Sequence, residues 1–183
     1  MNEKIENSGN IQKLLEIMET LRDPINGCPW DNEQNFKSLI QHTIEEVYEV
    51  ADAIDCNDML ALKDELGDLL FQIVFYAQIA NEAGLFKFQD IVETVSEKMV
   101  RRHPHVFSDV IYKTAEERLN AWEEIKMFEK NSNKENSYVL NSESALDGVI
   151  TTLPALSRAN KLQKKAARVG FDWDSLTPIL DKV

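Results

Sequence analysis

Acidic side chains at helical spacing are the clearest chemical feature of the sequence. Glu45, Glu46 and Glu49 lie in one short stretch, and Glu65 and Asp68 follow further along the chain. Because residues three or four apart are neighbours on a helix, Glu46 and Glu49 would share one face, and Glu65 and Asp68 another. Like charges at this spacing are mildly unfavourable, so a solvated acidic face is the simplest alternative for any single pair.

The predicted helix faces favour a cation site over that alternative. We predict helices over residues 36–54 and 58–83, with the acids at the margins of two apolar stripes. The stripes consist of Leu39, Ile40, Val47, Val50 and Ile54 on the first helix and of Leu62, Leu66, Leu69, Ile73 and Ala80 on the second. The short connection favours antiparallel packing, which would bring the carboxylates together. Carboxylates at the edge of a core are costly unless neutralised, and Mg²⁺ is a natural partner for such oxygen ligands.

A basic group in this acidic region indicates phosphate binding. Lys98, Arg101 and Arg102 follow one another at positions i, i+3 and i+4 of a predicted helix over residues 88–102. Cations near a helix C-terminus also offset the helix dipole, which is the simpler explanation. Beside a carboxylate-bound cation, however, they would hold an oligophosphate. For His103 and His105, we favour hydrogen bonding or a role in the turn over metal binding.

Tryptophan and cysteine residues allow fewer conclusions. Trp122 fits a core position or a pocket rim that stacks on a base, and Trp30 fits a turn anchor or a pocket wall. Two cysteines, Cys28 and Cys56, are too few for a cysteine-rich zinc site. We interpret Cys28 as structural.

The elements that must position these residues are helical. Leu14 and its apolar neighbours up to residue 21 predict a first helix, which the Asp23-Pro24 turn signal ends. Asp58 is the expected N-cap of the 58–83 helix. Thr114 and Glu117 have capping-box spacing and open a helix that reaches residue 130. Residues 106–112 remain ambiguous. The fold class predicted is all-α, a helical bundle.

Composition limits the partners. The net charge of −12 argues against nucleic acid or an anionic membrane as the main partner. The most apolar run, residues 69–80, is too short to span a bilayer, and residues 1–9 do not resemble a secretory signal. We therefore expect a soluble cytoplasmic protein.

Taken together, five sequence motifs resemble the MazG family of all-α nucleoside triphosphate pyrophosphohydrolases. The motifs are GCPWD at residues 27–31, EEVYE at 45–49, ELGDLLF at 65–71, KMVRRHPHVF at 98–107 and WEEIK at 122–126. The likeness covers roughly residues 11–130. It implies a helical bundle whose site is completed in a homodimer or higher homo-oligomer.

The resemblance also implies roles for individual residues. It makes Glu46, Glu49, Glu65 and Asp68 the Mg²⁺ ligands, with Mn²⁺ as a substitute, and Glu45 either a group behind the ligands or the base for the attacking water. All five acids are the predicted catalytic residues. The predicted substrate-binding residues are His42, Lys98, Arg101, Arg102, Trp122 and Lys126.

The predicted domain organisation is a first MazG-like domain over residues 1–130, a linker over 131–152 and a second unit beginning at 153. Phe171-Asp172-Trp173-Asp174 echoes the earlier Cys28-Pro29-Trp30-Asp31, and residues 154–183 carry a net charge of +3 against −15 before them. We expect this second unit to be incomplete at residue 183. A C-terminal helix that packs on the first domain is the alternative.

The expected function is Mg²⁺-dependent hydrolysis of nucleoside triphosphates, NTPs or dNTPs, to the monophosphate and pyrophosphate by water attack at the α-phosphorus. One alternative is a nucleotide-binding or dimerisation module with little turnover, whose catalysis resides in a missing second domain. A purely structural helical dimer with a solvated acidic face is the third.

Overall fold

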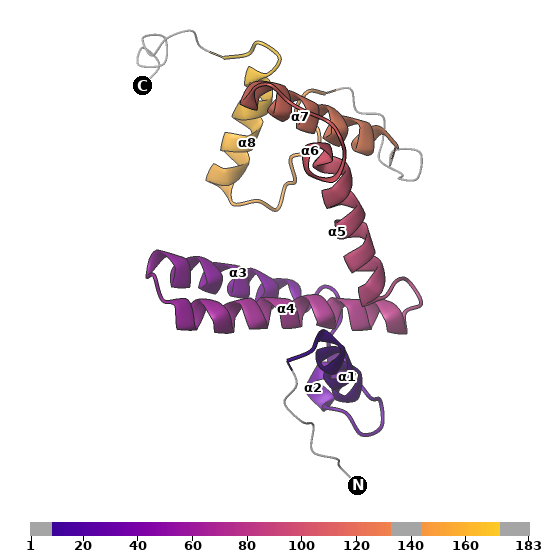
Figure 1. Cartoon of the computed structure of the whole chain (residues 1–183). Helices are drawn as coiled ribbons and strands as arrows, with labels where there is room; N and C mark the ends of the chain where they lie inside the picture. Colours follow the sequence, from indigo (N-terminus) through magenta and orange to yellow (C-terminus); the bar gives the residue numbers. More distant parts are fainter. Residues whose placement is uncertain (1–8, 133–143, 173–183) are drawn as a thin grey trace. The chain divides into compact units, whose positions relative to one another are not determined.

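The computed structural model describes residues 9–132 and 144–172, apart from the side chains of residues 127 and 130–132. All regular elements in these ranges are helices, which confirms the all-α prediction (Figure 1). They are α1 (Ile11–Leu21), α2 (Pro29–Glu33), α3 (Ile40–Asp55), α4 (Met59–Glu82), α5 (Phe88–Arg102), α6 (Pro104–Phe107), α7 (Ala115–Ser132) and α8 (Ala155–Ala167). The chain divides after Arg118 into two compact units, which are described separately.

The antiparallel pair α3 and α4 is the centre of the first unit (Figure 1). Asp58 caps α4 as predicted, since its carboxylate accepts hydrogen bonds from the backbone N–H groups of Leu60 and Ala61, both at 3.0 Å. At the other end, Gly84 has a φ of 68°, the left-handed conformation that a glycine adopts readily after a helix. These local signals explain why the predicted limits of α4 are correct within a residue.

The start of α3 differs from the prediction. The helix begins at Ile40 and not at residue 36. The side chain of Asn35 accepts hydrogen bonds from the N–H groups of Lys37 and Ser38, and the Ser38 hydroxyl accepts one from the N–H of Asn35. Because these bonds satisfy the backbone in a turn, they compete with the first helical turn.

The hydrophobic core lies where α1 crosses α4. It is built from Met18, Leu39, Val74, Phe75 and Ile79, all nearly inaccessible to solvent. Burial of these side chains provides the main stabilisation of the unit.

The predicted burial of the two apolar stripes is wrong for five of their members in the single chain. Ile40, Val47, Ile54, Leu66 and Ile73 are between 39% and 52% exposed. We call them the apolar α3–α4 face; helical periodicity correctly identifies these positions as apolar, although the described residues of the first unit leave them exposed.

Arg22 ties the turn after α1 to the end of α4. Its guanidinium forms two hydrogen bonds with the carboxylate of Glu82, at 2.8 and 2.6 Å, and donates to the backbone carbonyls of Asp31 and Gln34. It also lies over the ring of Phe75, 5.4 Å from the centroid. The Arg22 side chain is only 7% exposed, so these partners satisfy a buried charge.

Two short helices complete the first unit. Helix α2, which starts at Pro29 within the GCPWD motif, was not predicted. Helix α5 ends at Arg102, as expected from Pro104, and the ambiguous residues 106–112 contain the end of α6 and an irregular segment. The hydroxyl of Thr114 accepts from the N–H of Glu117 at 3.1 Å, which agrees with the predicted helix start there.

The second unit contains most of α7 and all of α8. The guanidinium of Arg168 contacts the carboxylate of Glu123 at 3.1 Å, and the Lys165 amine donates to the backbone carbonyl of Asp147. Residues 133–143 of the predicted linker, and the Trp173 part of the predicted repeat, lie outside the described residues. No helix in the described part of the chain is long and apolar enough to cross a membrane.

Candidate metal and nucleotide site

The two central helices bring three of the predicted metal ligands together. Carboxylate oxygens of Glu46 and Glu49 on α3 and of Glu65 on α4 all lie within 4.8 Å of one another. Asp68, one turn further along α4, is not in this closest group but is near enough to act electrostatically on Glu46 and Glu65. We call these four residues the acidic cluster.

Burial and mutual repulsion both disfavour ionisation in the acidic cluster. Burial and then the charges of Asp68 and Glu49 raise the pKa of Glu46, and the hydrogen bond that a protonated Glu46 donates to Glu49 acts in the same direction. Desolvation, followed by the charges of Glu49 and Asp68, raises the pKa of Glu65. No lysine or arginine of the described chain is among the groups that shift either pKa. The cluster is therefore a concentration of negative charge for which the described residues supply no counter-ion.

Such a donor set suits a hard divalent cation. Glutamate and aspartate oxygens are the ligands that Mg²⁺ prefers, and neutralisation by a cation would remove the repulsion. Asp64 also contributes to the raised pKa of Glu65, although the helical wheel places it outside the cluster. Its own neighbour is Lys63, with 3.7 Å between the amine and the carboxylate.

His42 and Glu45 lie on α3 before the cluster. Nδ1 of His42 is 3.6 Å from a carboxylate oxygen of Glu45, and the other carboxylate oxygen accepts from the side chain of Gln41 at 3.3 Å. The rings of His42 and Trp30 meet edge to face with centroids 5.9 Å apart. Trp30 is 51% exposed, and both predicted roles, a turn anchor and a pocket wall, stay open.

The predicted phosphate-binding residues do not join the acidic cluster in the single chain. Lys98, Arg101 and Arg102 lie on the last two turns of α5, whose helix contacts are with the neighbouring α4 and α6. Figure 1 shows α5 leading away from the α3–α4 pair. Within the described residues, none of these three cations is among the groups that shift the pKa of Glu46 or Glu65, so their expected convergence with the carboxylates stays a prediction.

The remaining predicted nucleotide contacts belong to the second unit. The Lys126 amine lies over the Trp122 ring, 4.6 Å from its centroid, and 3.1 Å from the Glu123 carboxylate. Burial opposes ionisation of Glu123, but Lys126 and Arg168 nevertheless hold its pKa below the usual value. Trp122 is 36% exposed, so its indole is accessible, as a position at a pocket rim would require.

Comparison with known proteins identifies this architecture. The model of the MazG nucleotide pyrophosphohydrolase domain matches residues 34–107, which include the acidic cluster and the basic group. The chain is 52% identical over 173 residues to the nucleoside triphosphate pyrophosphohydrolase of Escherichia coli K12, covering 94% of this chain and 63% of that protein. It is 42% identical over 175 residues to the nucleoside triphosphate pyrophosphohydrolase/pyrophosphatase MazG of Thermotoga maritima, covering 94% and 62%.

A solved structure gives the same assignment. The crystal structure of a mazG-related protein from Thermotoga maritima superposes with a TM-score of 0.53 at 31% identity, covering 63% of this chain and 98% of that one. The helical bundle and its acidic cluster thus define a MazG-type domain. The chain belongs to the MazG family and spans slightly less than two thirds of its E. coli and full-length T. maritima relatives.

Proposed function

We propose that this chain hydrolyses nucleoside triphosphates, NTPs or dNTPs, to the monophosphate and pyrophosphate with the help of Mg²⁺. The observation that carries the proposal is the convergence of Glu46, Glu49 and Glu65, with no counter-ion among the residues that the structure describes, inside the segment that matches the MazG domain. The printed names of the E. coli and T. maritima relatives supply the reaction class.

The acidic cluster would hold the cation. When bound there, Mg²⁺ would neutralise phosphate charge and lower the pKa of a coordinated water. Glu45 lies next to the cluster in sequence and has an exposed carboxylate, so it could accept a proton from water attacking the α-phosphorus. The hydrogen bond that it accepts from Gln41 would help to orient it, because a hydrogen-bonded partner limits the rotamers that a carboxylate samples.

The basic residues of α5 would bind the phosphates that leave as pyrophosphate. Lys98, Arg101 and Arg102 suit this role because guanidinium and ammonium groups form charge-assisted hydrogen bonds to phosphate oxygens. Trp122 and Lys126 would contact the nucleoside end of the substrate, where an indole can stack on any base.

A second copy of the chain would complete the site. The apolar α3–α4 face, with Ile40, Val47 and Leu66 about half exposed, supports a homodimer or higher homo-oligomer, because an unpartnered apolar face next to a site favours association. Such an assembly would also allow cations of one copy to approach carboxylates of another.

Product analysis across NTPs and dNTPs tests the proposal. The expected products with Mg²⁺ are the monophosphate and pyrophosphate, and a nucleoside diphosphate with orthophosphate would refute the cleavage position. Glu65→Gln should abolish most turnover while circular dichroism remains unchanged. Glu93→Gln is the matched control, since Glu93 is an exposed acid on α5 that accepts a hydrogen bond from Gln89.

The surplus of uncompensated acids in one chain also fits a module that binds nucleotide with little turnover. Calorimetry separates the two functions. Mg²⁺-dependent NTP binding without pyrophosphate release would favour the module, whereas turnover that Glu65→Gln removes would exclude it.

A further inference from the structure

A second candidate site lies between α6 and the start of α7, away from the acidic cluster along the chain. Here a pocket of about 380 Å³ is lined by His105, by residues 110–115 and by Arg118. This volume lies within the range of pockets that hold small molecules. None of these residues belongs to the predicted substrate-binding set.

The lining of this pocket is basic although the chain as a whole is strongly acidic. It contains Lys113, Arg118 and His105 but no carboxylate. The structure records no salt bridge for Lys113 or Arg118 within the described residues. The nearest acid along α7, Glu117, has its carboxylate turned to the backbone, where it accepts from the N–H of Lys113 at 2.7 Å. The pocket lining thus carries two positively charged side chains for which the described residues provide no ion pair.

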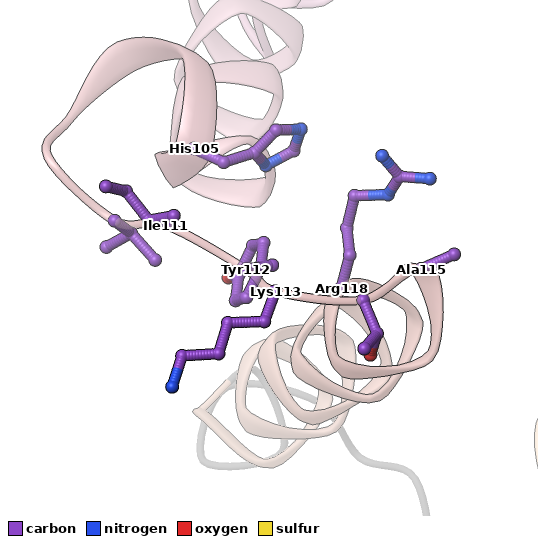
Figure 2. Close-up of a pocket in the computed structure, with 8 residues that line it drawn as sticks. His105, Ile111, Tyr112, Lys113, Ala115 and Arg118 are labelled. Atoms are coloured by element: carbon purple, nitrogen blue, oxygen red, sulfur yellow. The ribbon is translucent and has the colours of Figure 1, made fainter.

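His105 adds an unsatisfied polar atom. Its Nδ1 is buried and has no hydrogen-bond partner in the described structure. A buried nitrogen without a partner costs free energy, and a small shift of the ring that exposed this nitrogen to a bound oxyanion would recover that cost. Figure 2 shows the His105 imidazole and the Arg118 guanidinium extending into the same region, while Lys113 extends in another direction. An oxyanion between His105 and Arg118 would interact favourably with both.

The remaining lining is aromatic and aliphatic. The Tyr112 ring lies 5.6 Å from the His105 ring, and His105 in turn lies 5.8 Å from His103. Val110 and Ile111 complete the apolar side of the pocket. A planar ring attached to the oxyanion would therefore pack against Tyr112.

We infer that the α6–α7 pocket binds a small aromatic oxyanion, with a phosphate or carboxylate held by Arg118 and His105 and its ring packed against Tyr112. The site is independent of the proposed pyrophosphohydrolase reaction and needs no metal ion.

Titration of the full chain with simple probes tests this inference. Phenyl phosphate and benzoate represent the two oxyanion classes, and benzyl alcohol is the neutral control. Ring resonances of His105 and Tyr112 are followed by NMR without added Mg²⁺. We expect saturable shifts of these resonances with at least one oxyanion probe, and affinity at least about tenfold above that for benzyl alcohol. The stronger of the two oxyanion probes identifies the anionic group.

Two variants locate the binding. Arg118→Gln should weaken the stronger oxyanion probe at least about tenfold, because a charge-assisted contact is lost. Lys161→Gln removes an exposed charge on α8, outside the pocket, and should leave the affinity unchanged. Equal affinities for the two variants, or unchanged His105 and Tyr112 resonances in the wild type, would overturn the inference.

Discussion

Neutralising Glu46 should have opposite effects on stability without and with Mg²⁺. In the metal-free chain Glu46 has two acidic neighbours within 4.8 Å, and burial, followed by the charges of Asp68, Glu49 and Glu65, raises its pKa. Two unit charges at such a separation repel by about 1 kcal/mol in a water-like environment. Glu46→Gln keeps the size of the side chain and should therefore raise the free energy of unfolding by about 1–2 kcal/mol.

With Mg²⁺ present, we expect the wild type to be more stable than Glu46→Gln. A cation at about 100 times its dissociation constant stabilises the folded state by about 2.7 kcal/mol, or roughly 5–10 °C in melting temperature. We expect Mg²⁺ to raise the melting temperature of the wild type and of Glu93→Gln by this amount. For Glu46→Gln we expect almost no increase. Thermal melts monitored by circular dichroism, in EDTA and across a Mg²⁺ titration, measure both effects.

Two outcomes would contradict this prediction. If Mg²⁺ stabilised Glu46→Gln as much as the wild type, Glu46 would not be a ligand. If Glu46→Gln were less stable than the wild type in EDTA, repulsion within the acidic cluster would not be the dominant effect at this position.

Three further predictions concern the turn after α1. Arg22→Ala should lower the free energy of unfolding in urea by about 3 kcal/mol, because Glu82 and two carbonyls lose a buried partner; a loss below 1 kcal/mol would contradict this. The hydrogen bond from Arg22 lowers the pKa of Glu82 from its usual 4.5, against the effect of burial. The pair's stabilisation is therefore present above about pH 4.5 and lost as the pH falls through the lower folded value, and Glu82→Gln should flatten this acid limb in urea midpoints. Gly27→Ala should lower the melting temperature, since an added Cβ would collide with backbone oxygens of Leu21 and Asp23; an unchanged melt would disprove the close approach.

Signals contained within a few residues were sufficient to predict most helix limits. Asp58, Gly84 and Pro104 act on their own backbone neighbours, so the sequence alone fixes where α4 begins and where α4 and α5 end. The same holds for the convergence of Glu46 and Glu65, because helical period and a short connection together determine which faces of α3 and α4 meet.

Features that depend on distant residues could not be predicted in this way. Arg22 and Glu82 are sixty positions apart, and no local pattern indicates that they pair. The exposure of Ile40 and Leu66 is a property of the single chain, whereas periodicity reports only that a face is apolar. Likewise, the spacing of Lys98 and Arg102 predicts that they share a helix face. It does not predict which carboxylates lie opposite that face, or whether those carboxylates belong to the same copy of the chain.

Hydrolysis in ¹⁸O-labelled water tests whether water attacks the α-phosphorus of a substrate bound at the acidic cluster. Mass spectrometry of the products from an NTP and Mg²⁺ should find the label in the nucleoside monophosphate and none in pyrophosphate, with the labelled product absent for Glu65→Gln. Label in the pyrophosphate would place the attack at the β-phosphorus, and undiminished labelling by Glu65→Gln would remove the acidic cluster from the reaction.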